Sequence, residues 1–230
     1  MLYEPAGGIG GDFYDILPIG PDYRCILIGD ASGHEVPSGI VMAVILGFIW
    51  GAVREGSSPA EIVRSLNTFL IDHQERAGTP DLLATLFLGF LDTRNLTMCC
   101  INAGHPPPIL QRAAGGSSLI DPSGLMLGVD PHAAWVEHKF AFDAGDRLFL
   151  ATDGLTDAIL RTGGRLEAAG LLESVTRDAG ASADVMLEHI RELLAETKPS
   201  ERDDWTAVVL TFHGRTSTCL KAPTDQDDVP

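Results

Sequence analysis

Short apolar runs dominate this chain, and turn-forming residues separate them. Runs rich in Leu, Ile, Val and Phe, bounded by glycine, proline or aspartate, are typical of buried strands. The sequence predicts such strands at residues 23–29, 82–91, 96–101, 146–151 and 205–212. Residues 135–142 alternate between apolar and polar positions and predict a further strand. The polar stretch 92–95 between two of the strands predicts a hairpin turn.

Helices are predicted at residues 37–53, 58–77, 167–177 and 183–196. The first is apolar on nearly every side, which predicts a buried helix. Ser58 and Glu61 form a capping box at the start of the second helix, and Ser182 caps the last. Hairpin-connected strands beside paired helices indicate a layered α+β fold rather than a doubly wound parallel sheet.

The composition indicates the domain organisation of the chain and the cellular environment in which it works. The chain has 230 residues, of which 45% are hydrophobic, so we expect one domain over residues 1–213 and a polar, disordered tail over residues 214–230. None of the four cysteines has metal-ligand spacing, which favours a reducing cytoplasm over a disulfide framework. The longest apolar run, 39–53, is shorter than the roughly 20 residues that a membrane span needs. A net charge of −16 argues against nucleic acid or an anionic membrane as a partner.

Aspartates follow or precede several of the predicted strands. They are Asp12, Asp30, Asp153, and the adjacent pair Asp203 and Asp204. One such residue beside a glycine usually marks only a turn, whereas several at strand ends are typical of a preorganised metal site. A donor set made only of oxygens favours Mg²⁺, Mn²⁺ or Ca²⁺, and crowded carboxylates need a cation to remain ionised. The residues themselves therefore favour a divalent-metal hydrolase, in which two ions activate water against a phosphate ester.

The ordered set of motifs resembles the PPM family of metal-dependent protein phosphatases, in its SpoIIE/RsbU-like branch. The matching segments are GGDFYD at 10–15, GDASGH at 29–34, ATLF at 84–87, NAGHP at 102–106, LGV at 127–129, ATDGLTD at 151–157 and DDWT at 203–206. Each motif alone is weakly specific, but their order covers nearly the whole chain from residue 7 to 212. Glu35 stands where the family usually carries glycine, and Ser38-Gly39 where it often carries two alanines.

The resemblance implies a four-layer α-β-β-α sandwich of two antiparallel sheets flanked by helices. It implies two Mn²⁺ or Mg²⁺ ions held by Asp12, Asp30, Asp153 and Asp203, with the backbone carbonyl of Ala31 as a further ligand. Asp30 would bridge the two ions. Asp204 is the alternative to its neighbour Asp203.

The activity that the resemblance implies is that of a protein serine/threonine phosphatase. The expected substrate is a phosphorylated regulatory protein, an anti-sigma-factor antagonist of bacterial partner-switching signalling. An upstream sensor domain or protein would control the enzyme. The alternative is a PPM-fold regulatory binding module with little or no turnover. Intact aspartates at all the ligand positions favour the enzyme.

Several other residues have two interpretations each. His34 follows the metal loop and is either a general acid for the leaving oxygen or part of a turn. Asp15 and Asp157 are either groups that hold metal-bound waters or simple surface charges. For His105, in a proline-rich turn, orienting that turn is the better explanation.

Overall fold

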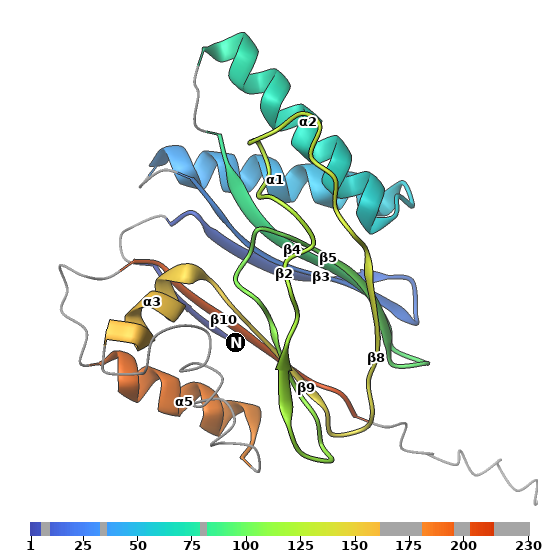
Figure 1. The fold of residues 1–230 in the computed structure, drawn as a ribbon, viewed down its shortest axis with the longest axis vertical. Coiled ribbons are helices and arrows are strands. Elements are labelled where there is room, and N and C mark those ends of the chain that lie inside the picture. The colour runs from blue at the N-terminus through green and yellow to red at the C-terminus, as the bar shows by residue number, and fades with distance from the viewer. Residues whose placement is uncertain (6–9, 33–35, 79–81, 162–180, 196–202, 214–230) are drawn as a thin grey trace, which may run out of the picture.

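Two antiparallel sheets are stacked face to face, with helices outside each (Figure 1). The computed structural model describes residues 1–5, 10–32, 36–78, 82–161, 181–195 and 203–213. One sheet consists, in spatial order, of β2 (Asp12–Ile19), β3 (Tyr23–Ala31), β4 (Ala84–Asp92), β5 (Thr97–Ala103) and β8 (His138–Ala141). The other consists of β1 (Leu2–Glu4), β10 (Trp205–Thr211), β9 (Arg147–Ala151), β6 (Ile109–Gln111) and β7 (Ser117–Leu119). The predicted four-layer sandwich is confirmed.

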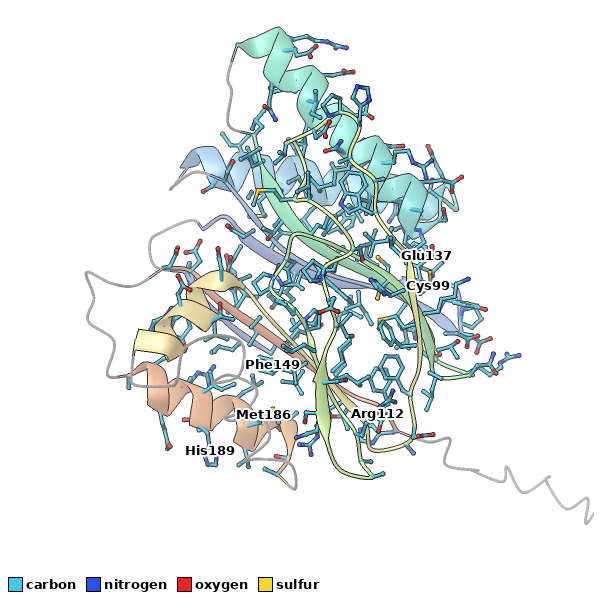
Figure 2. The ribbon with its side chains drawn as sticks, in the orientation of Figure 1. Cys99, Arg112, Glu137, Phe149, Met186 and His189 are labelled. Atoms are coloured by element: carbon cyan, nitrogen blue, oxygen red, sulfur yellow. The ribbon has the colours of Figure 1, made fainter. Side chains whose placement is uncertain are left out.

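The helices lie on the outer faces of the two sheets. They are α1 (Val36–Arg54) and α2 (Pro59–Ala77) over the first sheet, and α3 (Asp153–Arg161) and α5 (Ala183–Leu194) over the second. Alternation along each strand sends one set of side chains inward and the other toward the helices. In β3, for example, Ile26 and Ile28 join the core between the sheets, whereas Cys25 and Leu27 pack beneath α1 and α2. On the other side of the molecule, Phe149 of β9 and Met186 of α5 belong to one buried cluster (Figure 2).

Local signals in the sequence account for several element boundaries. The side chain of Ser58 accepts from the backbone N–H of Glu61 and the Glu61 carboxylate accepts from the N–H of Ser58, so the predicted capping box is confirmed. The cap at Ser182 is confirmed as well. In the hairpin between β4 and β5, the carboxylate of Asp92 accepts from the backbone N–H groups of Arg94 and Asn95.

The prediction that residues 37–53 form a fully buried helix is wrong. Helix α1 packs one face on β2 and β3, but Ile40 is 61% exposed and Val44 and Trp50 are each 44% exposed. Nothing lies within 4 Å of the position of a Cβ at Gly47. One side of the apolar helix α1 is therefore left uncovered by the described residues. No helix among them is long and apolar enough to cross a membrane.

Three other expectations differ from the structure or lie outside it. The strand expected at 135–142 is limited to β8, four residues long. Strands β1 and β2 were not predicted from the sequence. The predicted helix 167–177 and tail 214–230 lie outside the described residues.

Candidate metal centre

Asp12 and Asp30 lie opposite each other at one end of the first sheet. They are register partners in the antiparallel pairing of β2 with β3. Asp30 has the same parity as Ile26 and Ile28, so both strands aim a carboxylate into the end of the space between the sheets. Strand ends place these carboxylates at the rim of a rigid framework, which is where a site can be preorganised.

Two threonines of the opposite sheet fix the carboxylate of Asp12. The hydroxyls of Thr152 and Thr206 donate to Asp12 Oδ2 at 2.7 Å and 2.6 Å. Asp12 is only 2% exposed, and burial raises the pKa of its carboxyl to about 8. The two hydroxyl bonds act in the opposite direction and lower the pKa, while Asp30 and Asp204 raise it. Both bonds end on one oxygen, so they hold the carboxylate in a single orientation.

Asp30 is surrounded by other acidic groups. Burial is the largest cause that raises the pKa of its carboxyl to about 7, followed by the negative charges of Asp153, Asp203 and Asp204. Neighbouring carboxylates disfavour each other's ionised form unless a cation lies between them. Acidic residues from two distant parts of the sequence therefore act on Asp30 electrostatically.

Gly11 brings the backbone close to this cluster. A Cβ at Gly11 would lie 2.5 Å from the carbonyl oxygen of Ala31 and 2.7 Å from Asp30 Oδ1. The carbonyl oxygen of Gly11 accepts from the N–H of Ala31 at 3.1 Å. The absence of a side chain at this position therefore leaves the Ala31 carbonyl and the Asp30 carboxylate unobstructed.

Asp153, Asp203 and Asp204 come from the second sheet and its helix. Asp153 is the first residue of α3, directly after β9, and burial and the charge of Asp203 help to raise its pKa. The carboxylate of Asp204 accepts from the N–H of Gly11 at 2.8 Å, and Asp203 Oδ1 accepts from the N–H of Asp204 at 2.8 Å. Asp204 is thus engaged in holding the glycine turn, whereas Asp203 lies toward Asp153 and Gly154.

The donor set of this cluster suits a hard divalent cation. All its side-chain donors are carboxylate oxygens. Burial and, to a smaller extent, neighbouring acidic charges raise the pKa of Asp12 and Asp30, and a Mg²⁺ or Mn²⁺ ion would favour their ionised forms. Among the described residues, however, no group of three or more His, Cys, Asp or Glu side chains is gathered closely enough to hold an ion. The oxygen donors therefore suit such an ion chemically, although the described carboxylates do not form a closed ligand shell.

The structure places the remaining candidates in different surroundings. His34 lies outside the described residues. Asp15 accepts from Trp50 Nε1 of α1 at 2.9 Å and from the N–H of Ile16, so it ties β2 to that helix. Asp157 lies within electrostatic range of Asp153 and raises its pKa. Sequence reasoning did not single out Thr152 or Thr206, although each belongs to a motif that also carries an aspartate.

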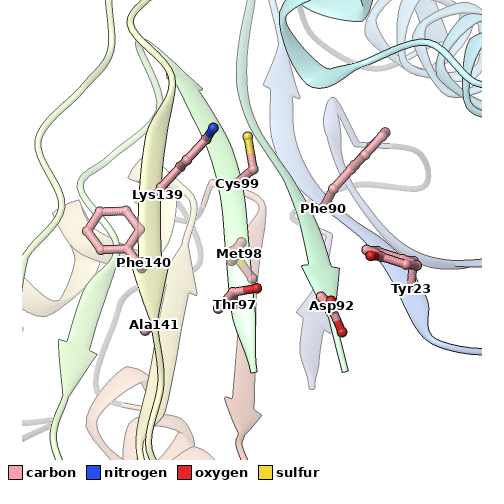
Figure 3. A pocket seen from close by; sticks show the side chains of 9 residues that line it. All are labelled: Tyr23, Phe90, Asp92, Thr97, Met98, Cys99, Lys139, Phe140 and Ala141. Carbon is pink, nitrogen blue, oxygen red and sulfur yellow. The ribbon is translucent and has the colours of Figure 1, made fainter. Parts of the chain in front are cut away.

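A cavity of about 610 Å³ lies at the other end of the same sheet (Figure 3). Tyr23, Phe90, Cys99 and Lys139 contribute to its lining. Tyr23 and Asp30 are seven residues apart on β3, which corresponds to roughly 23 Å of strand. Lys139 pairs with Glu137 at 3.6 Å. This cavity is therefore remote from the acidic cluster.

Comparison with known proteins identifies the family and agrees with the fold. The sequence profile of the SpoIIE family (Stage II sporulation protein E) matches residues 20–213, and the chain belongs to this family. The family is the SpoIIE/RsbU branch of the PPM-type phosphatases, which are metal-dependent.

Two curated relatives illustrate how much of each protein the match covers. Protein IcfG of Synechocystis sp. is 27% identical over 233 residues, or 91% of this chain and 37% of IcfG. Phosphoserine phosphatase RsbU of Bacillus subtilis is 23% identical over 208 residues, or 90% of this chain and 60% of RsbU. The chain thus spans between 37% and 60% of the length of these relatives.

Solved structures show the same fold. The RsbU and RsbW domains of Rv1364c from Mycobacterium tuberculosis match with a TM-score of 0.76 and 24% identity, over 93% of this chain and 60% of that one. RsbX in complex with magnesium matches with a TM-score of 0.68 and 15% identity, over 90% of each chain. At these identities the likeness concerns the arrangement of the sheets and helices.

Proposed function

We propose that this chain is a protein serine/threonine phosphatase that hydrolyses its substrate with a metal-activated water. The observation that carries the proposal is that Asp12, Asp30, Asp153 and Asp203 lie at one end of the sandwich, where burial and neighbouring acidic charges raise the pKa of Asp12, Asp30 and Asp153. Such a group of acids is costly to ionise without a cation, so its presence in a folded protein is explained by cation binding.

The residues that would hold the two ions are Asp12, Asp30, Asp153 and Asp203, together with the carbonyl of Ala31. When bound, the ions would lower the pKa of water and offset charge on the phosphoryl oxygens. Thr152 and Thr206 would keep one oxygen of Asp12 occupied, which leaves the other for the ion. Asp204 would hold the turn at Gly11 open, and Asp30 would serve both ions.

The substrate that we propose is phosphoserine or phosphothreonine in a regulatory protein. Two observations favour it: the family to which the chain belongs, and RsbU, a relative that is named a phosphoserine phosphatase. By the same resemblance, we infer that the regulatory protein is an anti-sigma-factor antagonist and that the enzyme acts in bacterial partner-switching, under an upstream sensor. The alternative, a regulatory module without turnover, has less support because every proposed ligand position carries a suitable residue.

Hydrolysis of phosphopeptides tests this function. Phosphate release should occur from a phosphoserine or phosphothreonine peptide with Mn²⁺ or Mg²⁺ present, and much more slowly from the matched phosphotyrosine peptide. Retention of full activity in excess chelator would exclude the metal-activated water. Tight metal binding with no hydrolysis of any peptide would favour the regulatory module.

A further inference from the structure

A buried histidine is linked to Asp30 through the neighbouring strand β4. His105 follows β5 in the turn 102–106 and is 1% exposed. Its Nδ1 lies 3.3 Å from the hydroxyl oxygen of Thr85 on β4. The same hydroxyl oxygen accepts from the backbone N–H of Asp30 at 3.2 Å, and Thr85 is the register partner of Asp30. A continuous chain of hydrogen bonds therefore joins His105 to the backbone of Asp30.

The hydroxyl of Thr85 can serve both neighbours at once. A threonine hydroxyl has one proton to donate and two lone pairs that accept. While Thr85 Oγ1 accepts from the N–H of Asp30, it can either donate its proton to Nδ1 of His105 or accept a proton from it, so the bond forms in either neutral tautomer of the ring. Burial lowers the pKa of His105 to about 3, which agrees with a neutral ring.

The turn that carries His105 is held independently of Thr85. The backbone N–H of His105 donates to Asn102 Oδ1 at 2.8 Å, and the N–H of Asn102 donates to the hydroxyl of Ser123 at 2.8 Å. Gly104 has a φ of +68°, and a Cβ there would lie 2.7 Å from the backbone nitrogen of Met126. The ring is thus delivered to Thr85 by a turn with little freedom.

We propose that His105 is a positioning residue that fixes Asp30 through the hydroxyl of Thr85, and that it thereby sets the affinity of the acidic cluster for a divalent cation. The inference rests on the proposed function of that cluster. It extends the role of His105 beyond orienting its own turn. Partners that orient metal ligands from behind typically change metal affinity by about 10- to 100-fold when they are removed.

Four variants separate positioning from mere packing. Thr85→Val keeps the shape of the side chain and removes the hydroxyl, and His105→Leu fills a similar volume without the ring nitrogen. Each should weaken Mn²⁺ binding by about 10-fold, measured by electron paramagnetic resonance titration of free Mn²⁺. Thr85→Ser and His105→Asn should restore most of the affinity, because serine keeps the hydroxyl and asparagine can place an oxygen where Nδ1 lies.

Two comparisons make the test specific. The Thr85→Val/His105→Leu double variant should bind Mn²⁺ about as weakly as either single variant, because both remove the same chain of bonds. Ser123→Ala disturbs the turn from its other side and should lower the melting temperature with a smaller change in Mn²⁺ affinity.

Defined results would overturn the inference. They are wild-type Mn²⁺ affinity in Thr85→Val, losses in the two single variants that add in the double variant, or an equal loss in Ser123→Ala. If the wild-type protein bound no Mn²⁺ at all, the proposed function itself would fail. If the wild type bound Mn²⁺ and Thr85→Val bound it as tightly, only the role of His105 would fail.

Discussion

The hydroxyl of Thr206 donates to Oδ2 of Asp12 at 2.6 Å, although the two residues are 194 positions apart. This bond joins the two sheets at the acidic cluster, because Asp12 begins β2 and Thr206 belongs to β10. It lowers the pKa of a carboxyl that burial raises to about 8. The second sheet therefore favours the ionised state that a metal ion needs in Asp12.

Removal of this hydroxyl should weaken metal binding more than it weakens the fold. Thr206→Val keeps the shape of the side chain and deletes the donor. We expect the Mn²⁺ concentration for half-maximal activity to rise by about 10-fold, with a stability loss of about 1 kcal/mol. Metal titration of the hydrolysis rate and thermal melting measure the two effects. The control is Thr68→Val on α2, whose hydroxyl donates to the carbonyl of Arg64 far from the cluster. Equal shifts in both variants would contradict this role.

The pH dependence of stability should reveal the raised pKa of Asp30, which burial and then the charges of neighbouring aspartates cause. Its carboxyl has a pKa of about 7 in the folded protein against an ordinary value of 3.8. A raised pKa means that the folded state holds this proton more tightly. Its contribution to stability is complete below about pH 4 and declines as the pH rises toward about 7. Metal-free protein should therefore lose stability across that range.

Asp30→Asn removes this titration. In chelator, its melting temperature should exceed that of the wild type by an amount that grows between about pH 4 and about pH 7. After allowance for solvent screening, the gain at neutral pH should be about 2 kcal/mol. Asp72→Asn, at an exposed ion pair with Arg76, should show no such trend. A constant difference between Asp30→Asn and wild type at every pH would disprove the raised pKa of Asp30.

Two glycine substitutions should have opposite effects on the stability of the protein. A Cβ at Gly11 would lie 2.5 Å from the Ala31 carbonyl oxygen, so Gly11→Ala should cost about 1–3 kcal/mol and abolish most activity. Gly47 lies within α1 with nothing within 4 Å of a Cβ, so Gly47→Ala should gain about 0.5–1 kcal/mol with activity unchanged. Denaturant unfolding and initial rates measure both. A stable, active Gly11→Ala variant would show that the turn does not crowd the cluster.

The sequence predicted correctly those helices and strands whose boundaries depend only on their own residues. The apolar run that gives β3 and the capping box at Ser58 need only their own residues, and both are confirmed. Helix α1 was misread because its composition is apolar all round, whereas its burial depends on which other segments cover it. Helix α3, unexpected after Asp153, starts in a segment that looks like a turn.

The sequence predicted which aspartates belong to the acidic cluster, but not which residues hold them in place. The motifs identified Asp12, Asp30, Asp153, Asp203 and Asp204, and the structure brings them within electrostatic range of one another. The threonines that hold Asp12, at separations of 140 and 194 residues, have no periodic signal in the sequence. Asp15 resembled a member of the cluster but bonds to Trp50, on the opposite face of the strand from Asp12. That the aspartates bind metal stays a prediction.

The central claim is that these aspartates form one metal-dependent phosphatase centre. The most direct measurement is the rate of phosphate release from a phosphoserine peptide, at increasing Mn²⁺ concentration, for the wild type, Asp30→Asn and Asp153→Asn. The account predicts a wild-type rate that depends on Mn²⁺ and disappears in chelator, and folded variants with at least about 100-fold lower rates, since each lacks a group that holds an ion. Wild-type rates in both variants, or a wild-type rate unaffected by chelator, would contradict it.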